Sequence, residues 1–81
     1  MYFVYILKSL KNSKRYIGFT SKSPMVRLSE HNNGCNKWTR GNKPFILINS
    51  ESFGSKLEAQ KREKFLKSGQ GRKWLDSNSI K

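Results

Sequence analysis

Cysteine and histidine are nearly absent from this sequence, which has one of each, Cys35 and His31. A single cysteine excludes an internal disulfide bond and suits a reducing, intracellular setting. We therefore expect a cytoplasmic protein, one that could associate with the nucleoid. One cysteine and one histidine are also too few ligands for a zinc site. Cys35 lies in the loop-like stretch "NNGCNKW", where we expect no neighbouring base, and this argues against a nucleophilic role.

Long apolar runs are also missing. No segment approaches the roughly 18 apolar residues of a membrane-spanning helix, so we expect no membrane partner. The start, "MYFVYILKSL", has too short an apolar run for a signal peptide and no basic segment before it. Without repeats or low-complexity blocks, the 81 residues predict a single domain, 1–81, with a frayed polar tail at 76–81.

Acidic residues are scarce: five carboxylates stand against 17 lysine and arginine residues, and the formal net charge is +12. Such an excess of positive charge is typical of proteins that bind a polyanion. Nucleic acid is the partner we expect, DNA first and RNA as the alternative. The five carboxylates include no close pair, which disfavours a two-metal nuclease. A single carboxylate, completed by waters and a substrate phosphate, can still hold one Mg²⁺.

The order of apolar, turn and helical patterns predicts six elements. Two β-prone runs on either side of "SLKNSK" predict a hairpin, and capping residues mark two amphipathic helices. The predicted segments are strands at 2–8 and 14–20, a helix at 23–34, a basic loop at 35–44, a strand at 45–48, a helix at 55–69 and a short helix at 71–75. This β-β-α-β-α-α order predicts an α+β fold, a three-stranded antiparallel sheet flanked by helices.

Several polar side chains are spaced so that they can meet. Pairing Tyr5 opposite Tyr16 or Gly18 in an antiparallel hairpin would put both phenols on one face, although aromatic residues also simply favour strands. Arg27 and His31 are four residues apart and share a helical face. Glu63 falls at the border of the apolar arc of its helix. There it could rim a cleft, or pair as a solvated residue with the lysine four positions later.

Four motifs in this order resemble the GIY-YIG nuclease family, and together they span nearly the whole chain. "FVY" at 3–5 stands at the first motif and matches it in the final Tyr5. "YIG" at 16–18, ten residues further on, is the second motif in literal form. "RLSEHNNG" resembles the family's helix signature, and "EAQKREKFLKSGQGRKWL" resembles the second-helix signature of small stand-alone bacterial members. The chain also resembles the N-terminal catalytic domain of the excision-repair incision nuclease.

The resemblance implies the GIY-YIG nuclease fold and a metal-dependent endonuclease. Such an enzyme hydrolyses phosphodiester bonds in DNA, here single-stranded or branched, by a one-metal mechanism. Glu63 would bind one Mg²⁺ or Mn²⁺, and Tyr5 or Tyr16 would help to deprotonate the attacking water. Arg27 would stabilise the charge that builds on the phosphate, and His31 would assist by hydrogen bonding. The products would carry a 5′-phosphate and a 3′-hydroxyl.

Two positions depart from the family pattern. Many relatives have a lysine soon after the second motif, for which Lys22 is the available substitute. Longer members place an asparagine twelve residues after the glutamate, where this chain has Leu75, with Asn78 as a weak substitute. We expect the missing asparagine to slow or reshape catalysis without abolishing the metal site. Gly18 follows the pattern and would let the backbone pack closely under the site.

Two other functions fit the same composition. One is a nucleic-acid-binding module with little or no turnover, and the other is a subunit that acts only with a protein partner. We expect weak sequence preference and a monomer or weak homodimer. The residues expected to contact the strand are Lys22, Lys37, Trp38, Arg40 and Lys43. Trp38 is suited either to stack on an unpaired base or to pack within its loop.

Overall fold

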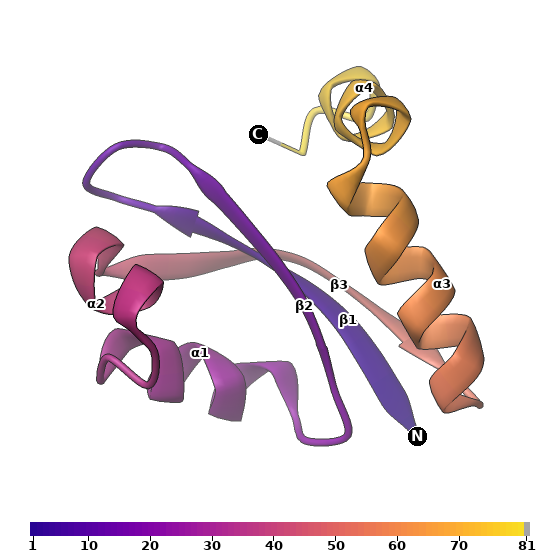
Figure 1. Ribbon diagram of the computed structural model, residues 1–81, viewed down its shortest axis with the longest axis horizontal. Helices are drawn as coiled ribbons and strands as arrows, with labels where there is room; N and C mark the ends of the chain where they lie inside the picture. Colours follow the sequence, from indigo (N-terminus) through magenta and orange to yellow (C-terminus); the bar gives the residue numbers. More distant parts are fainter. Residues whose placement is uncertain (81) are drawn as a thin grey trace.

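The first two strands form the predicted hairpin, and its register decides which side chains meet (Figure 1). A computed structural model describes residues 1–80, in which β1 (Tyr2–Ser9) pairs antiparallel with β2 (Arg15–Thr20). Tyr5 lies opposite Gly18, and Leu7 lies opposite Tyr16. Because directly paired residues point to the same face of a sheet, Tyr5 and Tyr16 project from one face of the hairpin.

The third strand is longer than its apolar residues suggested. β3 (Phe45–Phe53) pairs antiparallel with β1, so the strand order is β2-β1-β3. The sequence predicted only 45–48, because the residues after Ile48 are mostly polar. They still form a strand because β3 is an edge strand whose polar residues can face solvent: Ser50 and Ser52 are exposed, whereas Glu51 and Phe53 are half-buried.

The predicted helices are present, with shifted ends. α1 (Pro24–Asn32) begins after Ser23, whose hydroxyl accepts a hydrogen bond from the Met25 N–H. α3 (Lys56–Lys67) begins after Ser55, which caps the Glu58 N–H in the same way. α4 (Gly69–Ser77) is longer than the short helix predicted at 71–75.

The basic stretch 35–44 contains a helix that the sequence prediction missed. α2 (Lys37–Asn42) begins after Asn36, whose side chain accepts from the Thr39 N–H, while the Thr39 hydroxyl accepts from the Asn36 N–H. This reciprocal cap starts a helix of six residues, so the prediction of a loop is wrong for this part.

The segment that carries α2 is fastened to the rest of the fold at both ends. Before it, the Asn32 side chain donates to the Phe45 carbonyl at 3.1 Å and accepts from the Phe45 N–H at 2.6 Å. After it, the Asn42 carbonyl accepts from the Ser9 hydroxyl at 2.6 Å, and the Asn42 side chain accepts from Asn12. α2 is therefore held against both α1 and the β1–β2 turn.

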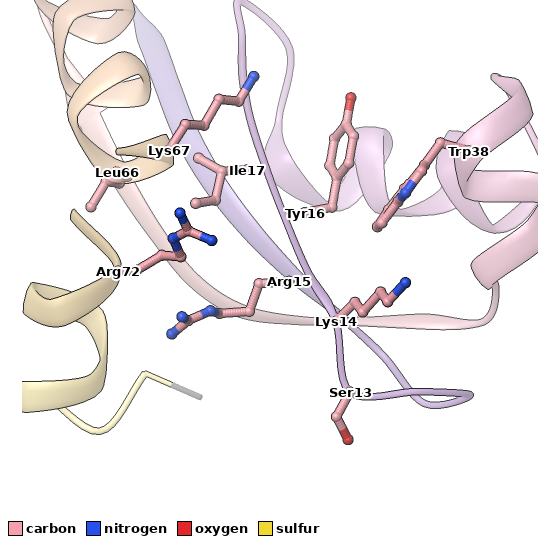
Figure 2. Close-up of a pocket in the computed structure, with 9 residues that line it drawn as sticks. All are labelled: Ser13, Lys14, Arg15, Tyr16, Ile17, Trp38, Leu66, Lys67 and Arg72. Carbon is pink, nitrogen blue, oxygen red and sulfur yellow. The ribbon is translucent and has the colours of Figure 1, made fainter. Parts of the chain in front are cut away.

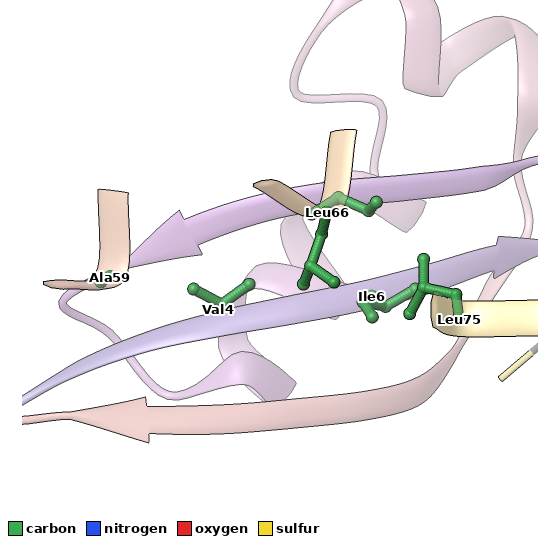
Figure 3. Packing of buried hydrophobic residues seen from close by; sticks show 6 residues of the cluster. Val4, Ile6, Ala59, Leu66 and Leu75 are labelled. Carbon is green, nitrogen blue, oxygen red and sulfur yellow. The ribbon is translucent and has the colours of Figure 1, made fainter. Parts of the chain in front are cut away.

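The two faces of the sheet carry separate apolar clusters. On one face, Val4 and Ile6 of β1 pack with Ala59 and Leu66 of α3 and with Leu75 of α4 (Figure 3). On the other face, Tyr5 and Leu7 pack with Phe45 and Leu28 beneath α1. The continuous apolar run of β1 is thus explained, because this central strand is covered on both faces.

The C-terminal end lies against the hairpin as far as it is described. The Ile80 N–H donates to the Leu75 carbonyl at 2.9 Å, and the half-buried Ile80 side chain packs on the α3–α4 cluster. Arg15 donates to both Asp76 and the Ile80 carbonyl. The frayed tail expected from residue 76 is therefore not what the structure shows for 76–80, while Lys81 lies outside the described residues. Within residues 1–80, every helix is too short or too polar to cross a bilayer.

Candidate active site

Tyr5, Arg27 and His31 meet on the α1 face of the sheet. Helix α1 places Arg27 and His31 one turn apart over β1, as their spacing predicted. The Tyr5 hydroxyl lies 3.0 Å from His31 Nε2 and 3.4 Å from Arg27 Nε. Arg27 Nη2 lies 3.3 Å from the same His31 nitrogen. Three groups that can polarise a substrate are thereby held in mutual contact.

The donors around His31 define where its proton lies. A guanidinium only donates, so His31 Nε2 accepts from Arg27, and the Tyr5 hydroxyl donates to it as well. The ring proton then lies on Nδ1, 3.3 Å from the Cys35 sulfur. Burial lowers the pKa of His31, and the positive charge of Arg27 lowers it further. Both effects favour the neutral form of the imidazole inside this cluster.

Tyr5 is a buried phenol. It is 1% exposed, and burial raises its pKa even though Arg27 works in the opposite direction. It lies directly on Gly18: a Cβ at that position would be 2.5 Å from the Tyr5 oxygen. A side chain at position 18 would thus push the phenol away from His31, which explains the glycine of the "YIG" motif in local terms.

Glu30 is a member of this cluster that the sequence reasoning missed. Its two carboxylate oxygens accept from Arg27 Nη1 at 2.6 Å and from Lys22 Nζ at 3.0 Å. The hydrogen bonds from Lys22 and Arg27 lower the pKa of Glu30. Burial opposes the charge on Arg27, but its hydrogen bonds to Tyr5 and Glu30 outweigh that effect and raise the Arg27 pKa. The three-residue spacing of Arg27 and Glu30 on one helix was the available signal.

Tyr16, on the neighbouring strand β2, lies next to the cluster of Tyr5, Arg27 and His31. Its half-buried ring lies 4.6 Å from the His31 ring and 6.3 Å from the Tyr5 ring, centroid to centroid. Figure 2 shows that its hydroxyl and the Lys67 amino group are directed to the same side of a hollow beside β2. Of the two phenols, Tyr16 is the one that borders open space.

Glu63 lies on α3, which packs against the other face of the sheet and also contacts β2. Its side chain is 20% exposed, and its carboxylate lies 3.5 Å from Lys67 Nζ. Among residues 1–80 this ion pair is its only side-chain partner, so no hydrogen bond joins Glu63 to the Tyr5–His31 cluster. Lys67, the ion-pair partner of Glu63, lines the same hollow as Tyr16, whereas Glu63 itself is not among the lining residues.

Glu63 is a single carboxylate, paired with Lys67, that could serve as one ligand of a hard cation. No group of three or more acidic, histidine or cysteine side chains occurs within the described chain, so a closed protein cage for a metal is absent there. A single carboxylate at a partly exposed rim is nevertheless the kind of ligand that Mg²⁺ accepts, since that ion keeps several waters and uses substrate oxygens. Glu63 is the residue here that could hold it.

The other predicted contact residues divide into two groups. Trp38 joins the site: its ring stacks on Tyr16 at 5.3 Å and on Phe45 at 5.7 Å, and it remains 38% exposed. Lys22 reaches the site through Glu30. The remaining predicted cations, Lys37, Arg40 and Lys43, are exposed on α2 and at its end.

Three further positions can now be placed. Cys35 lies beside His31, contrary to the expectation that it has no neighbouring base. Leu75, where longer relatives have asparagine, is fully buried in the core. Asn78 ends α4 and donates from its side chain to the Trp74 carbonyl. Leu75 therefore serves the packing of the core, and Asn78 serves the end of α4.

Comparison with known proteins agrees with this arrangement. The model of the GIY-YIG catalytic domain matches residues 1–75. The UPF0213 protein CPE1444 of Clostridium perfringens is 42% identical in an alignment of 85 residues, gaps included. The alignment covers 100% of this chain and 89% of the relative. The UPF0213 protein SH2523 of Staphylococcus haemolyticus is 40% identical, covering 76% of this chain and 74% of the relative. The solution NMR structure of the UPF0213 protein BH0048 from Bacillus halodurans superimposes with a TM-score of 0.58 at 36% identity, covering 95% of this chain and 84% of that one.

These matches establish that the chain belongs to the GIY-YIG catalytic domain family, whose domain implies nuclease activity in general. Its relatives in that family are the small stand-alone UPF0213 proteins, which this chain matches along most of their length. The α+β fold with a three-stranded antiparallel sheet is confirmed as well.

Proposed function

We propose that this protein is an endonuclease that hydrolyses phosphodiester bonds in DNA with the help of one Mg²⁺ or Mn²⁺ ion. The observation that supports it most directly is the convergence of Tyr5, Arg27 and His31 next to Tyr16, because a protein that only binds nucleic acid needs no such cluster. The net charge of +12 supports a nucleic-acid substrate. RNA is the alternative polymer.

In this proposal Arg27 stabilises the charge that develops on the scissile phosphate. Its hydrogen bonds to Tyr5 and Glu30 raise its pKa, so it stays protonated throughout any working pH range. Glu30 and His31 also fix the direction of the guanidinium before substrate arrives. A cation that is already oriented stabilises a transition state without the cost of reorganisation.

Tyr16 is the tyrosine to which we assign the general base. Tyr5 is buried, and its proton is engaged with His31, so it serves to position His31 and Arg27. Tyr16 borders the hollow, so its phenolic oxygen is the one placed to take the proton of an attacking water. The water oxygen then bonds to phosphorus as the bond to the 3′-oxygen breaks. That oxygen takes a proton from solvent, which leaves a 5′-phosphate and a 3′-hydroxyl.

Glu63 is the residue we assign to the metal ion. When bound, such an ion acts as a Lewis acid on the phosphate oxygens. The Lys67 amino group, 3.5 Å from the carboxylate, competes with it for the same oxygens. In this proposal a cation replaces the Lys67 ammonium at the Glu63 carboxylate.

The test is metal-dependent cleavage of labelled single-stranded, duplex and branched DNA, with Mg²⁺, Mn²⁺ or EDTA. Glu63→Gln should abolish cutting and leave DNA binding intact. Glu58→Gln, on the same helix, should cut like the wild type. If wild type and Glu63→Gln bind equally and neither cuts, the chain is a nucleic-acid-binding module or a subunit that needs a partner protein.

A further inference from the structure

A hollow of about 650 Å³ runs along the open side of β2, between α2 and the α3–α4 corner (Figure 2). Among its lining residues are four cationic and two aromatic side chains. They are Lys14, Arg15, Lys67, Arg72, Tyr16 and Trp38. Of these six, only Tyr16 and Trp38 were expected from the sequence to belong to the site, so the cluster around His31 does not account for the four cations of this surface.

The four cations are not equivalent. Arg15 is engaged by Asp76 and the Ile80 carbonyl, and Lys67 is engaged by Glu63. Lys14 and Arg72 have no acidic partner among the described residues, and both are exposed. The hollow thus keeps two uncommitted positive charges, which suits the phosphates of a strand.

An aromatic wall closes the side of the hollow nearest α2. The rings of Phe45, Trp38 and Tyr16 stand in succession, with interplanar angles of 28° and 30° at the two contacts. Within this row the ring faces contact one another, so a base would pack against the parts of Trp38 and Tyr16 that remain exposed to the hollow, without selection of which base it is. In a duplex the base faces are already stacked and the edges paired, so reaching the wall would require flipping a base out.

The hollow is also lined by one residue that contacts His31 and by another that contacts Glu63. Tyr16 lies in its wall and against His31, while Lys67 lies in its wall and against Glu63. A strand lying in the hollow would therefore enter the space between the α1 cluster and Glu63. A second, smaller hollow, lined by Lys8, Ser13, Arg15 and Asp76, has no aromatic lining and carries an acidic group.

We infer that this hollow receives an unpaired nucleotide next to the scissile phosphate, with its base against the Trp38–Tyr16 wall and its phosphate on Arg72 and Lys14. The substrate class is accordingly single-stranded nucleic acid or a single-stranded arm of a branched molecule. This inference rests on the proposed function for the position of the scissile bond. The binding contacts themselves can be measured without cleavage.

The experiment measures binding by fluorescence anisotropy in EDTA, so that no strand is cut. Three probes share one sequence: an unstructured DNA strand, the same RNA strand, and the DNA duplex. Trp38→Ala should weaken binding to the single strand about fivefold or more and leave duplex affinity unchanged. Arg72→Ala should reduce the salt dependence of binding by about one phosphate contact, whereas its neighbour Lys73→Ala, which does not line the hollow, should not.

A second probe keeps the test decisive if Trp38→Ala does not fold. A DNA strand with abasic sites in place of bases retains every phosphate, and it should bind the wild type about fivefold or more weakly than the intact strand. Trp38→Phe should preserve the preference for the intact strand. The inference is overturned if intact and abasic strands bind the wild type equally, if folded Trp38→Ala loses single strand and duplex alike, or if Lys73→Ala behaves like Arg72→Ala.

The experiment distinguishes DNA from RNA as the bound strand, and it distinguishes failure of the proposed nuclease activity from failure of the proposed binding hollow. Equal binding of the DNA and RNA strands identifies the stacked base and phosphate as the recognised features, and stronger binding of one strand adds a contact to its sugar. If the hollow variants bind as expected but no substrate is cut, the proposed function fails while the inference stands. If DNA is cut but the hollow variants bind like the wild type, the inference alone fails.

Discussion

The hydroxyl of Tyr5 lies 3.0 Å from Nε2 of His31, although 26 residues separate the two along the chain. Both side chains are almost completely buried, and burial shifts the pKa of each toward its uncharged form. The contact ties the central strand to α1 at the point where Arg27 is also held. It therefore couples the proton on one histidine to the stability of the candidate site.

Stability should fall as the pH drops below about 6.5, the ordinary pKa of histidine. Because burial lowers the pKa of folded His31, the unfolded chain binds the proton more readily. Unfolding then becomes easier toward acid, by at most about 1.4 kcal/mol per pH unit for one group. Urea unfolding between about pH 7 and pH 5 measures this slope. His31→Gln should flatten it, and an identical slope in the variant would contradict the assignment.

Gly18→Ala should cost about 1–3 kcal/mol of unfolding free energy and most of any nuclease activity. The new methyl group would overlap the Tyr5 phenol, which must then leave His31. Gly41→Ala is the matched control, since a Cβ there meets nothing within 4 Å. Denaturant unfolding and a cleavage assay check both variants. Equal stability of the two would show that Tyr5 is not confined as described.

The effects of substituting Tyr5 and Tyr16 on kcat and on stability should differ. Tyr16→Phe should lower kcat about 100-fold or more and leave the unfolding free energy nearly unchanged, because it removes a general base from an open position. Tyr5→Phe should cost about 1 kcal/mol of stability through the lost hydrogen bond to His31, with a smaller effect on kcat. The reverse pattern would assign the base to Tyr5.

Lys67→Met should tighten Mn²⁺ binding by up to about fivefold, because the Lys67 ammonium no longer competes for the Glu63 carboxylate. Calorimetry without DNA measures this directly. Lys64→Met removes a charge from the same helix turn without removing an ion pair of Glu63, so it should have a smaller effect. Metal affinity that rises equally in both variants would reflect net charge alone.

Raising the salt concentration from about 50 to about 200 mM should weaken DNA binding at least about tenfold. The reason is that a chain with a net charge of +12 displaces counterions from several phosphates at once. Titrations of one labelled strand at a series of salt concentrations provide the slope. A flat response would argue against a surface that follows the phosphate backbone.

The sequence predicted the parts of this molecule that local pattern controls. Alternation along the first hairpin placed Tyr5 and Tyr16 on one face, and helical spacing brought Arg27 and His31 together. It did not predict α2, because six residues around a tryptophan and a glycine carry a weak helical signal. The Asn36–Thr39 capping pattern was the clue in that stretch.

The remaining part of the site depended on contacts between distant segments. Lys14 and Arg72 become neighbours of one hollow only after α4 has packed back on the hairpin, which no local pattern encodes. Cys35 reaches His31 because α1 ends between them in a tight turn with Gly34 at φ 78°. For Glu63 the helical spacing allowed either a cleft rim or a pair with Lys67, and the structure shows the pair with Lys67.

The double clasp between Asn32 and Phe45, together with the grip of Ser9 and Asn12 on Asn42, has an evolutionary consequence. The two ends of residues 37–42 are thereby fixed by other parts of the chain, and inside them Thr39 is buried and Trp38 stacks on Tyr16. We expect related proteins to vary the exposed positions of this segment, such as Lys37 and Arg40, while the candidate site residues on the other elements keep their places.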